Sequence, residues 1–145
     1  MSFNIRVYGI YLSQSKVLVT DECRGEMLMT KFPGGGLEFG EGIIDALQRE
    51  CIEEFGQAFK VLDHFYTTEF FIASAFNNKQ QLISIYYFIE PIEEVKFNIT
   101  EKVFDFDEVE GAQSFRWISM DELSENCFTF PIDKHVSQLL LQHLT

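Results

Sequence analysis

Short apolar runs with strand character open the chain. The runs "FNIRVYGIYL" (3–12) and "KVLVT" (16–20) are rich in β-branched and aromatic residues, and only "SQS" separates them. This arrangement predicts a β-hairpin. The run "EMLMTKF" (26–32) predicts another strand, which ends at Pro33. Because glycine permits backbone angles that other residues avoid, we expect a glycine-rich loop over 33–36.

The period of the apolar positions changes after Gly42. From Ile43 onward, apolar residues recur at spacings of three and four, which makes one stripe along a helix. Its members are Ile44, Leu47, Cys51 and Phe55. Gly56 follows directly, as is typical of a helix C-terminus. The pattern therefore predicts a helix that begins at Ile43 and ends at Gly56.

Aromatic and β-branched runs return in the second half of the chain. The runs "KVLDHFYTTEFFIASAF" (60–76) and "QLISIYYFIEPI" (81–92) flank the polar turn "NNKQ" and predict a second, long hairpin. The acidic span 93–110 predicts a loop with one short strand. The run "SFRWISMDEL" (114–123) predicts a strand that leads into a helix start.

A C-terminal helix is predicted over 131–144, where Pro131 suits a helix entry. Its apolar face would carry Val136, Leu139, Leu140 and Leu144. No internal repeat or linker divides the sequence. We therefore expect one domain over 1–145, of the α/β class in the broad sense, with two or three helices packed on a mixed sheet.

The composition favours a folded chain and restricts its partners. Of 145 residues, 46% are hydrophobic, and 16 Phe are ample for one core. The formal net charge of −12 disfavours attraction to long nucleic acids and to anionic membranes. An anionic substrate remains compatible with this charge, because bound divalent cations would become the dominant local charges.

No segment resembles an export signal or a membrane span, so we expect a cytoplasmic protein. The cysteine content agrees with that expectation, because Cys23, Cys51 and Cys127 are widely separated and form no CxxC pair. Reduced, packed thiols explain them better than catalysis does, since no activating partner is evident in the sequence.

Three glutamates crowd the predicted helix. Glu50, Glu53 and Glu54 share one arc beside the apolar stripe, and like charges at these spacings cost roughly 0.2–0.5 kcal/mol per pair. Arg49 can pair with Glu53 at the next turn but cannot neutralise all three. A solvated acidic face is one interpretation. The other is a site for Mg²⁺ or Mn²⁺, which favour carboxylate oxygens.

The complete pattern favours the metal site. Gly35, Glu41, Arg49 and the following glutamates and Gly56 make the spacing G-x5-E-x7-R-E-x-x-E-E-x-G. This resembles the signature box of the Nudix hydrolase family, GX5EX7REUXEEXGU, in which U is aliphatic. All seven fixed Gly, Glu and Arg positions are present. Cys51 and Gln57 occupy the U positions, and Gln57 departs from the pattern.

The resemblance implies an α-β-α sandwich around a mixed sheet and hydrolysis of a pyrophosphate bond by water. It implies that the metals would be bound by Glu50, Glu53, Glu54 and the backbone carbonyl of Gly34. Arg49 would orient the glutamates and belongs, with Glu50 and Glu53, to the expected catalytic residues. Glu41 and Gly35 would support this arrangement from outside the metal ligands.

Members of the family often recruit another acidic residue from outside the box. Glu110 is the candidate for that base or extra ligand, Glu108 and Glu94 compete with it, and a plain loop carboxylate is the alternative for Glu110. Arg6 and Lys31 are candidates for contacts to substrate phosphate. Phe130 and Asp133 are candidates for a base pocket, although helix entry and N-capping explain both more simply. The histidines show no metal-binding spacing.

Substrate and assembly stay open at this point. Small nucleoside triphosphates, ADP-ribose, nucleotide sugars and dinucleoside polyphosphates are all compatible with the box, and a homodimer is compatible with the many phenylalanines. A noncatalytic nucleotide or ADP-ribose sensor with the same fold is the alternative function. A calcium-binding interaction domain is disfavoured, because the chain has no DxDxDG loop.

Overall fold

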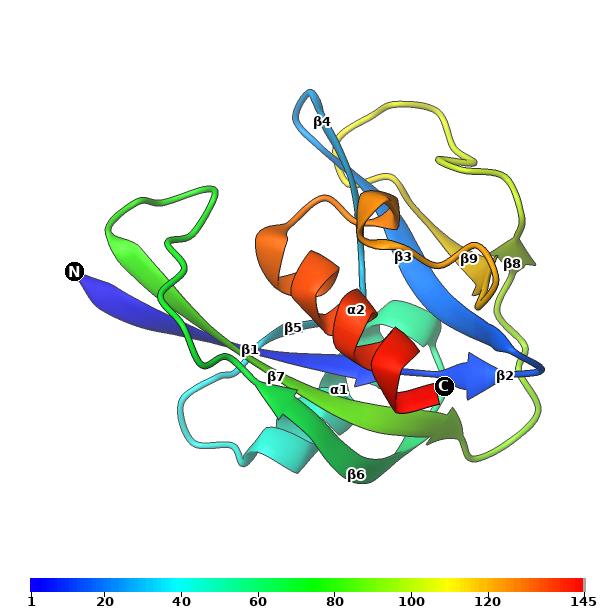
Figure 1. The fold of residues 1–145 in the computed structure, drawn as a ribbon, viewed down its shortest axis with the longest axis horizontal. Helices are drawn as coiled ribbons and strands as arrows, with labels where there is room; N and C mark the ends of the chain where they lie inside the picture. Colours follow the sequence, from blue (N-terminus) through cyan, green and yellow to red (C-terminus); the bar gives the residue numbers. More distant parts are fainter. Residues whose placement is uncertain (145) are drawn as a thin grey trace. The chain divides into compact units, whose positions relative to one another are not determined.

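Two β-sheets and two α-helices make up residues 1–144, the part of the chain that the computed structural model describes (Figure 1). This confirms the predicted mixed α+β class. By its internal contacts the chain divides into two units. The first contains Met1–Tyr11 and Pro33–Lys96, and the second contains Leu12–Phe32 and the chain from Phe97 onward.

The sheet of the first unit has the strand order β5-β1-β7-β6. Strand β1 (Ser2–Ile10) runs parallel to β7 (Gln80–Pro91) along its whole length, as Figure 1 shows. Strand β6 (Phe59–Thr67) pairs antiparallel with β7, which confirms the predicted hairpin, although its first strand ends at Thr67 rather than at residue 76. The edge strand β5 (Gly34–Gly36) pairs antiparallel with the end of β1.

Two expectations about this region are wrong. Gly34–Gly36 is a strand rather than a loop, because the glycine backbone forms a regular ladder with Arg6–Tyr8. The predicted first hairpin also fails for β1, which pairs only with strands of its own sheet. Strand character is local, whereas the choice of partner depends on burial against segments that are distant in sequence.

Helix α1 (Ile43–Phe55) packs on the first sheet through contacts with β1, β5 and β6. It ends at Gly56, whose φ of 71° is the left-handed conformation that favours glycine. The buried face consists of Ala46, Leu47, Cys51 and Phe55. Ile44 is 47% exposed, so its predicted place in the buried stripe is wrong. It shares the angle of the stripe but stands in the first turn, and Ala46 is buried instead.

The sheet of the second unit has five strands, in the order β2-β3-β9-β8 with β4 also paired to β3. Strands β2 (Leu12–Ser13) and β3 (Lys16–Arg24) form a tight hairpin. Its two turn residues, Gln14 and Ser15, both have positive φ, as a two-residue hairpin turn requires. This short pairing is all that exists of the hairpin predicted for 3–20.

The remaining strands of this sheet follow the sequence-based expectations. Strand β4 (Met27–Lys31) is antiparallel to β3, and β9 (Gln113–Ser119) pairs with the other edge of β3. The acidic span contains only the two-residue strand β8 (Ile99–Thr100), as predicted.

A 3₁₀ turn, η1 (Glu125–Cys127), precedes α2 (Pro131–Leu144), which confirms the C-terminal helix and its proline entry. Leu144 is 47% exposed, so the apolar face ends before it. In residues 1–144 neither helix is long and apolar enough to cross a membrane.

A buried ion pair holds the second sheet together. Asp21 on β3 is fully buried and accepts hydrogen bonds from Arg116 Nε on β9 at 2.8 Å and from Thr30 Oγ1 on β4 at 2.6 Å. The backbone N–H of Phe104 donates to the same carboxylate at 3.1 Å. One side chain therefore joins three strands and the loop that precedes β9.

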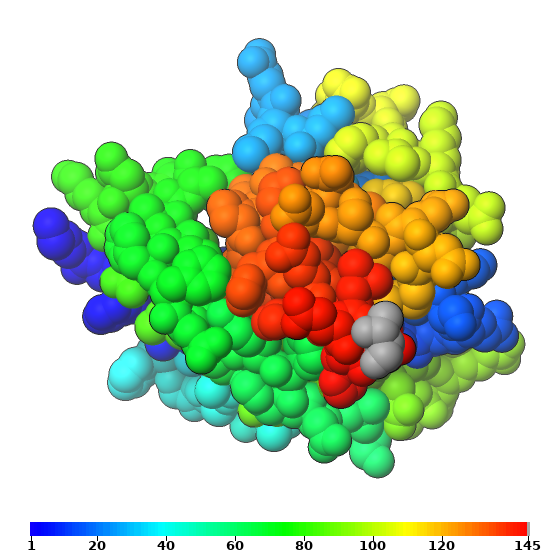
Figure 2. Space-filling model, in the orientation of Figure 1, coloured from blue at the N-terminus to red at the C-terminus, as the bar shows by residue number. Residues whose placement is uncertain are grey.

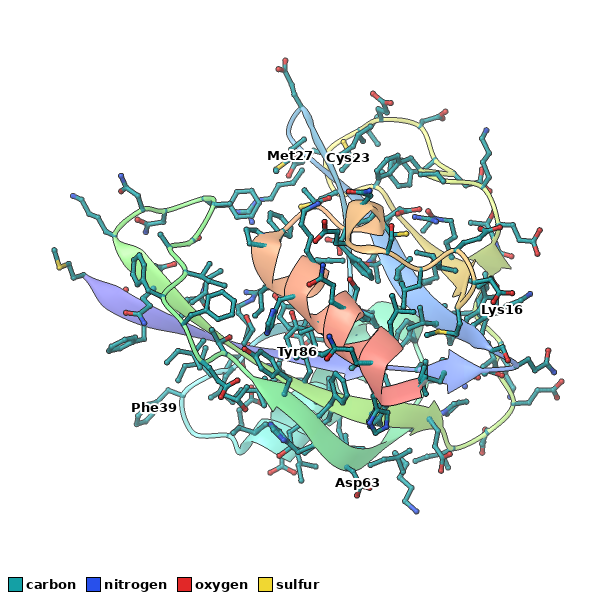
Figure 3. The ribbon with its side chains drawn as sticks, viewed as in Figure 1. Lys16, Cys23, Met27, Phe39, Asp63 and Tyr86 are labelled. Atoms are coloured by element: carbon teal, nitrogen blue, oxygen red, sulfur yellow. The ribbon has the colours of Figure 1, made fainter. Side chains whose placement is uncertain are left out.

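We predict that Asp21→Asn lowers the free energy of unfolding by about 3–5 kcal/mol, because it leaves the Arg116 guanidinium buried without its counter-charge. Urea unfolding measures the loss. Adding Arg116→Met to this variant should recover part of it, since both charges are then gone. The exposed Asp63, whose side chain points away from β6 in Figure 3, supplies the control Asp63→Asn. Equal stability of the two single variants would contradict the prediction.

Candidate active site

Because Gly35 has no side chain, the carboxylate of Glu50 on α1 can lie against the backbone of β5. Gly35 pairs with Val7, and an added Cβ on Gly35 would lie 2.5 Å from Oε2 of Glu50. A larger side chain fits there only if the Glu50 carboxylate moves. The Glu50 carboxylate is thus seated against the strand, and its side chain is only 13% exposed.

The register of β5 with β1 decides where its carbonyls point. Hydrogen bonds from Gly9 N to Pro33 O and from Leu37 N to Ile5 O define the hydrogen-bonded positions of this antiparallel ladder. Gly34 and Gly36 fall between them, at positions whose carbonyls face away from β1. The Gly36 carbonyl accepts a hydrogen bond from Arg49. The Gly34 carbonyl leaves the same free edge two residues earlier.

Arg49 connects the box from end to end. Its guanidinium binds Glu41 through two hydrogen bonds, from Nε at 2.9 Å and from Nη2 at 2.6 Å. Nη2 also donates to the carbonyl of Gly36 at 3.0 Å. Nη1 lies 3.1 Å from Oε1 of Glu50 and 3.2 Å from Oε2 of Glu53. One cation therefore contacts three of the box carboxylates and the strand β5.

Glu41 also closes the loop that joins β5 to α1. Its Oε1 accepts the backbone N–H of Glu38 at 2.8 Å, so the loop and the helix share one carboxylate. Glu38 itself is a looser partner of Arg49, at 3.8 Å. Phe39 stands at the tip of this loop and points away from the protein in Figure 3. The geometry places Glu41 where it braces the loop.

The surroundings of Glu41 and Glu50 shift their pKa values in opposite directions. Hydrogen bonds from Arg49, then from the N–H of Glu38, lower the pKa of Glu41 to about 2. In return, the bond to Glu41 raises the pKa of Arg49. Burial raises the pKa of Glu50, although Arg49 and the more distant Arg6 oppose the shift. A further cation beside Glu50 would therefore favour its ionised form.

The oxygen atoms of the predicted ligands suit a hard divalent cation. Glu50, Glu53 and Glu54 provide only carboxylate oxygens, and the Gly34 carbonyl adds a neutral oxygen, which is the donor set that Mg²⁺ and Mn²⁺ prefer. In the described residues no three acidic, His or Cys side chains stand as a ready metal cluster. The guanidinium of Arg49 occupies the space between Glu50 and Glu53. Glu53 is 57% exposed and stands at the solvent side.

Arg6 is the substrate-contact candidate that lies in the same unit as the box. It stands opposite Gly36 in the β1–β5 ladder, and an added Cβ on Gly36 would lie 3.3 Å from its Nη1. Its Nε donates to the hydroxyl of Tyr8 at 3.2 Å. The predicted role of Arg6 in phosphate binding stays a prediction, but its place beside β5 agrees with it.

The other candidates belong to the second unit. The carboxylate of Glu110 accepts a hydrogen bond from the backbone N–H of Gly25, at the turn between β3 and β4. Figure 2 shows this turn projecting from the surface beside the yellow segment that contains Glu110. Lys31 is buried and pairs with Glu22 at 3.0 Å. The catalytic role of Glu110 and the substrate contact of Lys31 stay predictions.

Phe130 and Asp133 flank the start of α2. Asp133 is buried in the first turn of the helix, and Phe130 directly precedes Pro131. The backbone N–H of Thr30 donates to Thr129 Oγ1 at 2.8 Å, which ties this helix entry to β4. Their proposed place in a base pocket is not tested by these contacts.

Two residues that pattern analysis did not assign are explained by contacts. Gln57, at the aliphatic position of the box, accepts the N–H of Lys96 at 2.8 Å and donates to the Glu94 carbonyl at 3.3 Å. Hydrogen bonds to the backbone thus replace apolar packing at the end of α1.

The sequence pattern does not single out Tyr8 as a functional residue, because a buried aromatic residue in a strand carries no functional signal of its own. Burial raises the pKa of the Cys51 thiol to about 12, in agreement with a packed, reduced cysteine.

Comparisons with known proteins identify the family of the chain. The family model described as NUDIX domain matches residues 3–140. No curated protein sequence matches the chain.

Similar solved structures include the E. coli ORF135 protein, with 18% identity, a TM-score of 0.70 and coverage of 100% of this chain and 93% of that chain. A NUDIX hydrolase from Nitrosomonas europaea has 24% identity, a TM-score of 0.64 and coverage of 97% and 89%. The MutT protein from Methanosarcina mazei Go1 has 16% identity, a TM-score of 0.70 and coverage of 98% and 94%. At these identities the structural similarity concerns the fold.

The family match covers most of the chain and includes the whole box. The chain therefore belongs to the NUDIX domain family and is a Nudix pyrophosphohydrolase. Its sequence-based assignment to the family is confirmed.

We predict that Gly35→Ala lowers hydrolytic activity by about 100-fold, because a displacement of about 1 Å at a reacting site costs that much. The added Cβ would force the Glu50 carboxylate off the strand. Steady-state kinetics and urea unfolding of the same preparation measure the two effects. Gly42→Ala is the control in the same segment, since its Cβ would meet Asp45 Oδ2 at an ordinary 3.5 Å. Wild-type rates for Gly35→Ala would refute the seating of Glu50.

A second prediction concerns acid stability. The pKa of Glu41 is about 2 in the folded protein against an ordinary 4.5, so ionised Glu41 stabilises the fold above its unfolded pKa. That contribution is lost as the pH falls through about 2. The difference in the free energy of unfolding between wild type and Glu41→Gln should be largest above pH 4.5 and shrink toward pH 2. A difference that stays constant with pH would contradict this, and Glu38→Gln is the matched control.

Proposed function

We propose that this protein hydrolyses the pyrophosphate bond of a nucleoside diphosphate linked to another moiety, in a reaction that requires Mg²⁺ or Mn²⁺. The observation that supports this most directly is the half-buried Glu50 carboxylate, seated on Gly35 and oriented by Arg49. A carboxylate removed from water at a strand edge is unfavourable alone and favourable beside a cation.

The metal ligands in this proposal are Glu50, Glu53, Glu54 and the Gly34 carbonyl. When bound, the cation would neutralise the phosphate charge and make a water more acidic. Glu50 is held in place by the strand and by Arg49, whereas Glu53 is exposed at the solvent side. Arg49 keeps the carboxylates apart and aligned, and Glu41 keeps Arg49 in position.

The proposed chemistry is a displacement at phosphorus. The oxygen of a water forms a new bond to one phosphorus, and the bridging P–O bond breaks. The departing phosphate keeps the electron pair of that bond, and the water gives up a proton to a base. Glu110, outside the box, is the proposed base, and Glu108 and Glu94 are the alternatives. The products are two phosphate compounds, one of them a nucleoside monophosphate or a similar ester.

The substrate class is a small phosphorylated nucleotide: a nucleoside triphosphate, ADP-ribose, a nucleotide sugar or a dinucleoside polyphosphate. We propose that Lys31, Phe130 and Asp133 contact the part of the substrate beyond the diphosphate. We also propose that residues 1–145 act as a single domain, which is supported by a family match that spans residues from both units.

A substrate panel with product identification tests this proposal. Wild type should hydrolyse at least one member with Mg²⁺ or Mn²⁺, and a chelator should abolish the reaction. Glu50→Gln, and the double variant Glu53→Gln with Glu54→Gln, should each lose about 10²–10³-fold in rate and bind Mn²⁺ more weakly in calorimetry. Glu122→Gln, an exposed change in the second unit, is the control.

The outcomes separate the two candidate functions. Turnover that persists after chelation, or that these substitutions do not change, would refute the metal-dependent mechanism. Tight nucleotide binding without turnover at any metal would favour the noncatalytic sensor.

A further inference from the structure

Arg6 and Tyr8 make a rigid pair on one face of β1. Residues two apart in a strand share a face, and Arg6 Nε donates to the Tyr8 hydroxyl at 3.2 Å. The Tyr8 ring is buried and stacks on Tyr86, with centroids 5.1 Å apart and an interplanar angle of 28°. Tyr86 is the parallel-ladder partner of Tyr8 and lies in the middle of this sheet in Figure 3. The hydroxyl that accepts the hydrogen bond from Arg6 therefore belongs to a ring that is buried and stacked.

Arg6 and Glu50 approach β5 from its two faces. Successive residues of a strand project to opposite faces, so Gly35 and Gly36 open opposite sides of the same backbone. The Glu50 carboxylate fills the space beside Gly35, and the Arg6 guanidinium lies where a Cβ on Gly36 would be only 3.3 Å away. The backbone of β5 thus separates the Arg6 guanidinium from the Glu50 carboxylate.

The free edge of β5 lies between these two groups. The Gly34 and Gly36 carbonyls point from that edge, as the ladder register requires. If a phosphate group lies at this edge, the Arg6 guanidinium beside Gly36 is placed to contact its oxygens. The planar guanidinium suits phosphate oxygens, which it can bind in a bidentate way. Arg6 is also a basic side chain at this position in a chain whose net charge is −12.

We propose that Arg6 binds the phosphate oxygens of the substrate, that Tyr8 positions Arg6 for this contact, and that Gly36 provides the space for it. This inference rests on the proposed function. The alternative role of Arg6 is structural, through its place 5.9 Å from the centre of the Tyr8 ring. The two roles differ in which measured quantity responds to substitution.

Steady-state kinetics on the best substrate of the panel test the proposal. Arg6→Gln should raise KM by about 10–100-fold, as the loss of a charge-assisted hydrogen bond predicts, and Arg6→Lys should recover part of it. Tyr8→Phe keeps the ring stack and should raise KM about 3–10-fold with little change in thermal stability. Gly36→Ala should act in the same direction. Lys60→Gln, an exposed change on β6, is the control.

Binding of inorganic pyrophosphate in the presence of Mg²⁺ provides a readout that needs no turnover. Wild type should bind it more tightly than Arg6→Gln, by a factor similar to the change in KM. If wild type hydrolyses nucleotides and Arg6→Gln and Tyr8→Phe match it in KM and in pyrophosphate affinity, the role of Arg6 is refuted and the proposed function stands. If wild type hydrolyses nothing, the proposed function fails, and the pyrophosphate comparison still decides the role of Arg6. Should Arg6→Gln fail to fold, Arg6→Lys and Tyr8→Phe carry the same comparison.

Discussion

The site depends on the ion pairs and hydrogen bonds that the guanidinium of Arg49 makes. Carboxylates at helical spacings of three and four repel one another, and here Arg49 contacts Glu50 and Glu53 on its own helix and Glu41 in the preceding loop. The same group binds the Gly36 carbonyl, so helix, loop and strand share one cation. Arg49 neutralises part of the cluster, and burial still raises the pKa of Glu50, so the crowding of acids is compatible with the metal-dependent chemistry proposed above.

Each of the three glycines of β5 contributes a different feature to the site. Gly35 leaves room for a carboxylate on one face, and Gly36 leaves room for a guanidinium on the other. Gly34 contributes a carbonyl at the free edge of the strand. A loop would not have aligned these three features, because only a strand alternates its residues between two faces and its carbonyls between two edges. The ladder with Arg6–Tyr8 thus gives the glycine run its functional geometry.

Local patterns predicted most elements and misplaced several partners. The helix over 43–55, the second hairpin and the C-terminal helix follow directly from periodicity and from glycine and proline signals. The pairing of β1 could not be read from the sequence, because only Leu12 of the upstream run and the neighbouring Ser13 pair with β3. Around the axis of α1, Ile44 lies at the same angle as the buried residues, but it is exposed because it stands in the first turn of the helix. Gln57 breaks the aliphatic pattern for a reason that appears only in its bonds to 94–96.

The sequence by itself determined the family, the reaction class and the acidic residues to consider, because the spacing of the box records which side chains share one helix face and which glycines precede it. Only the tertiary structure decided that the glycine run is an edge strand, that Arg49 connects Glu41 with Glu50, and that Arg6 lies across β5 from the glutamates. The first and third of these facts depend on strand register, because a slip of one residue would move every side chain of the strand to the other face. Register is set by the burial of distant segments against each other, and no local motif encodes it.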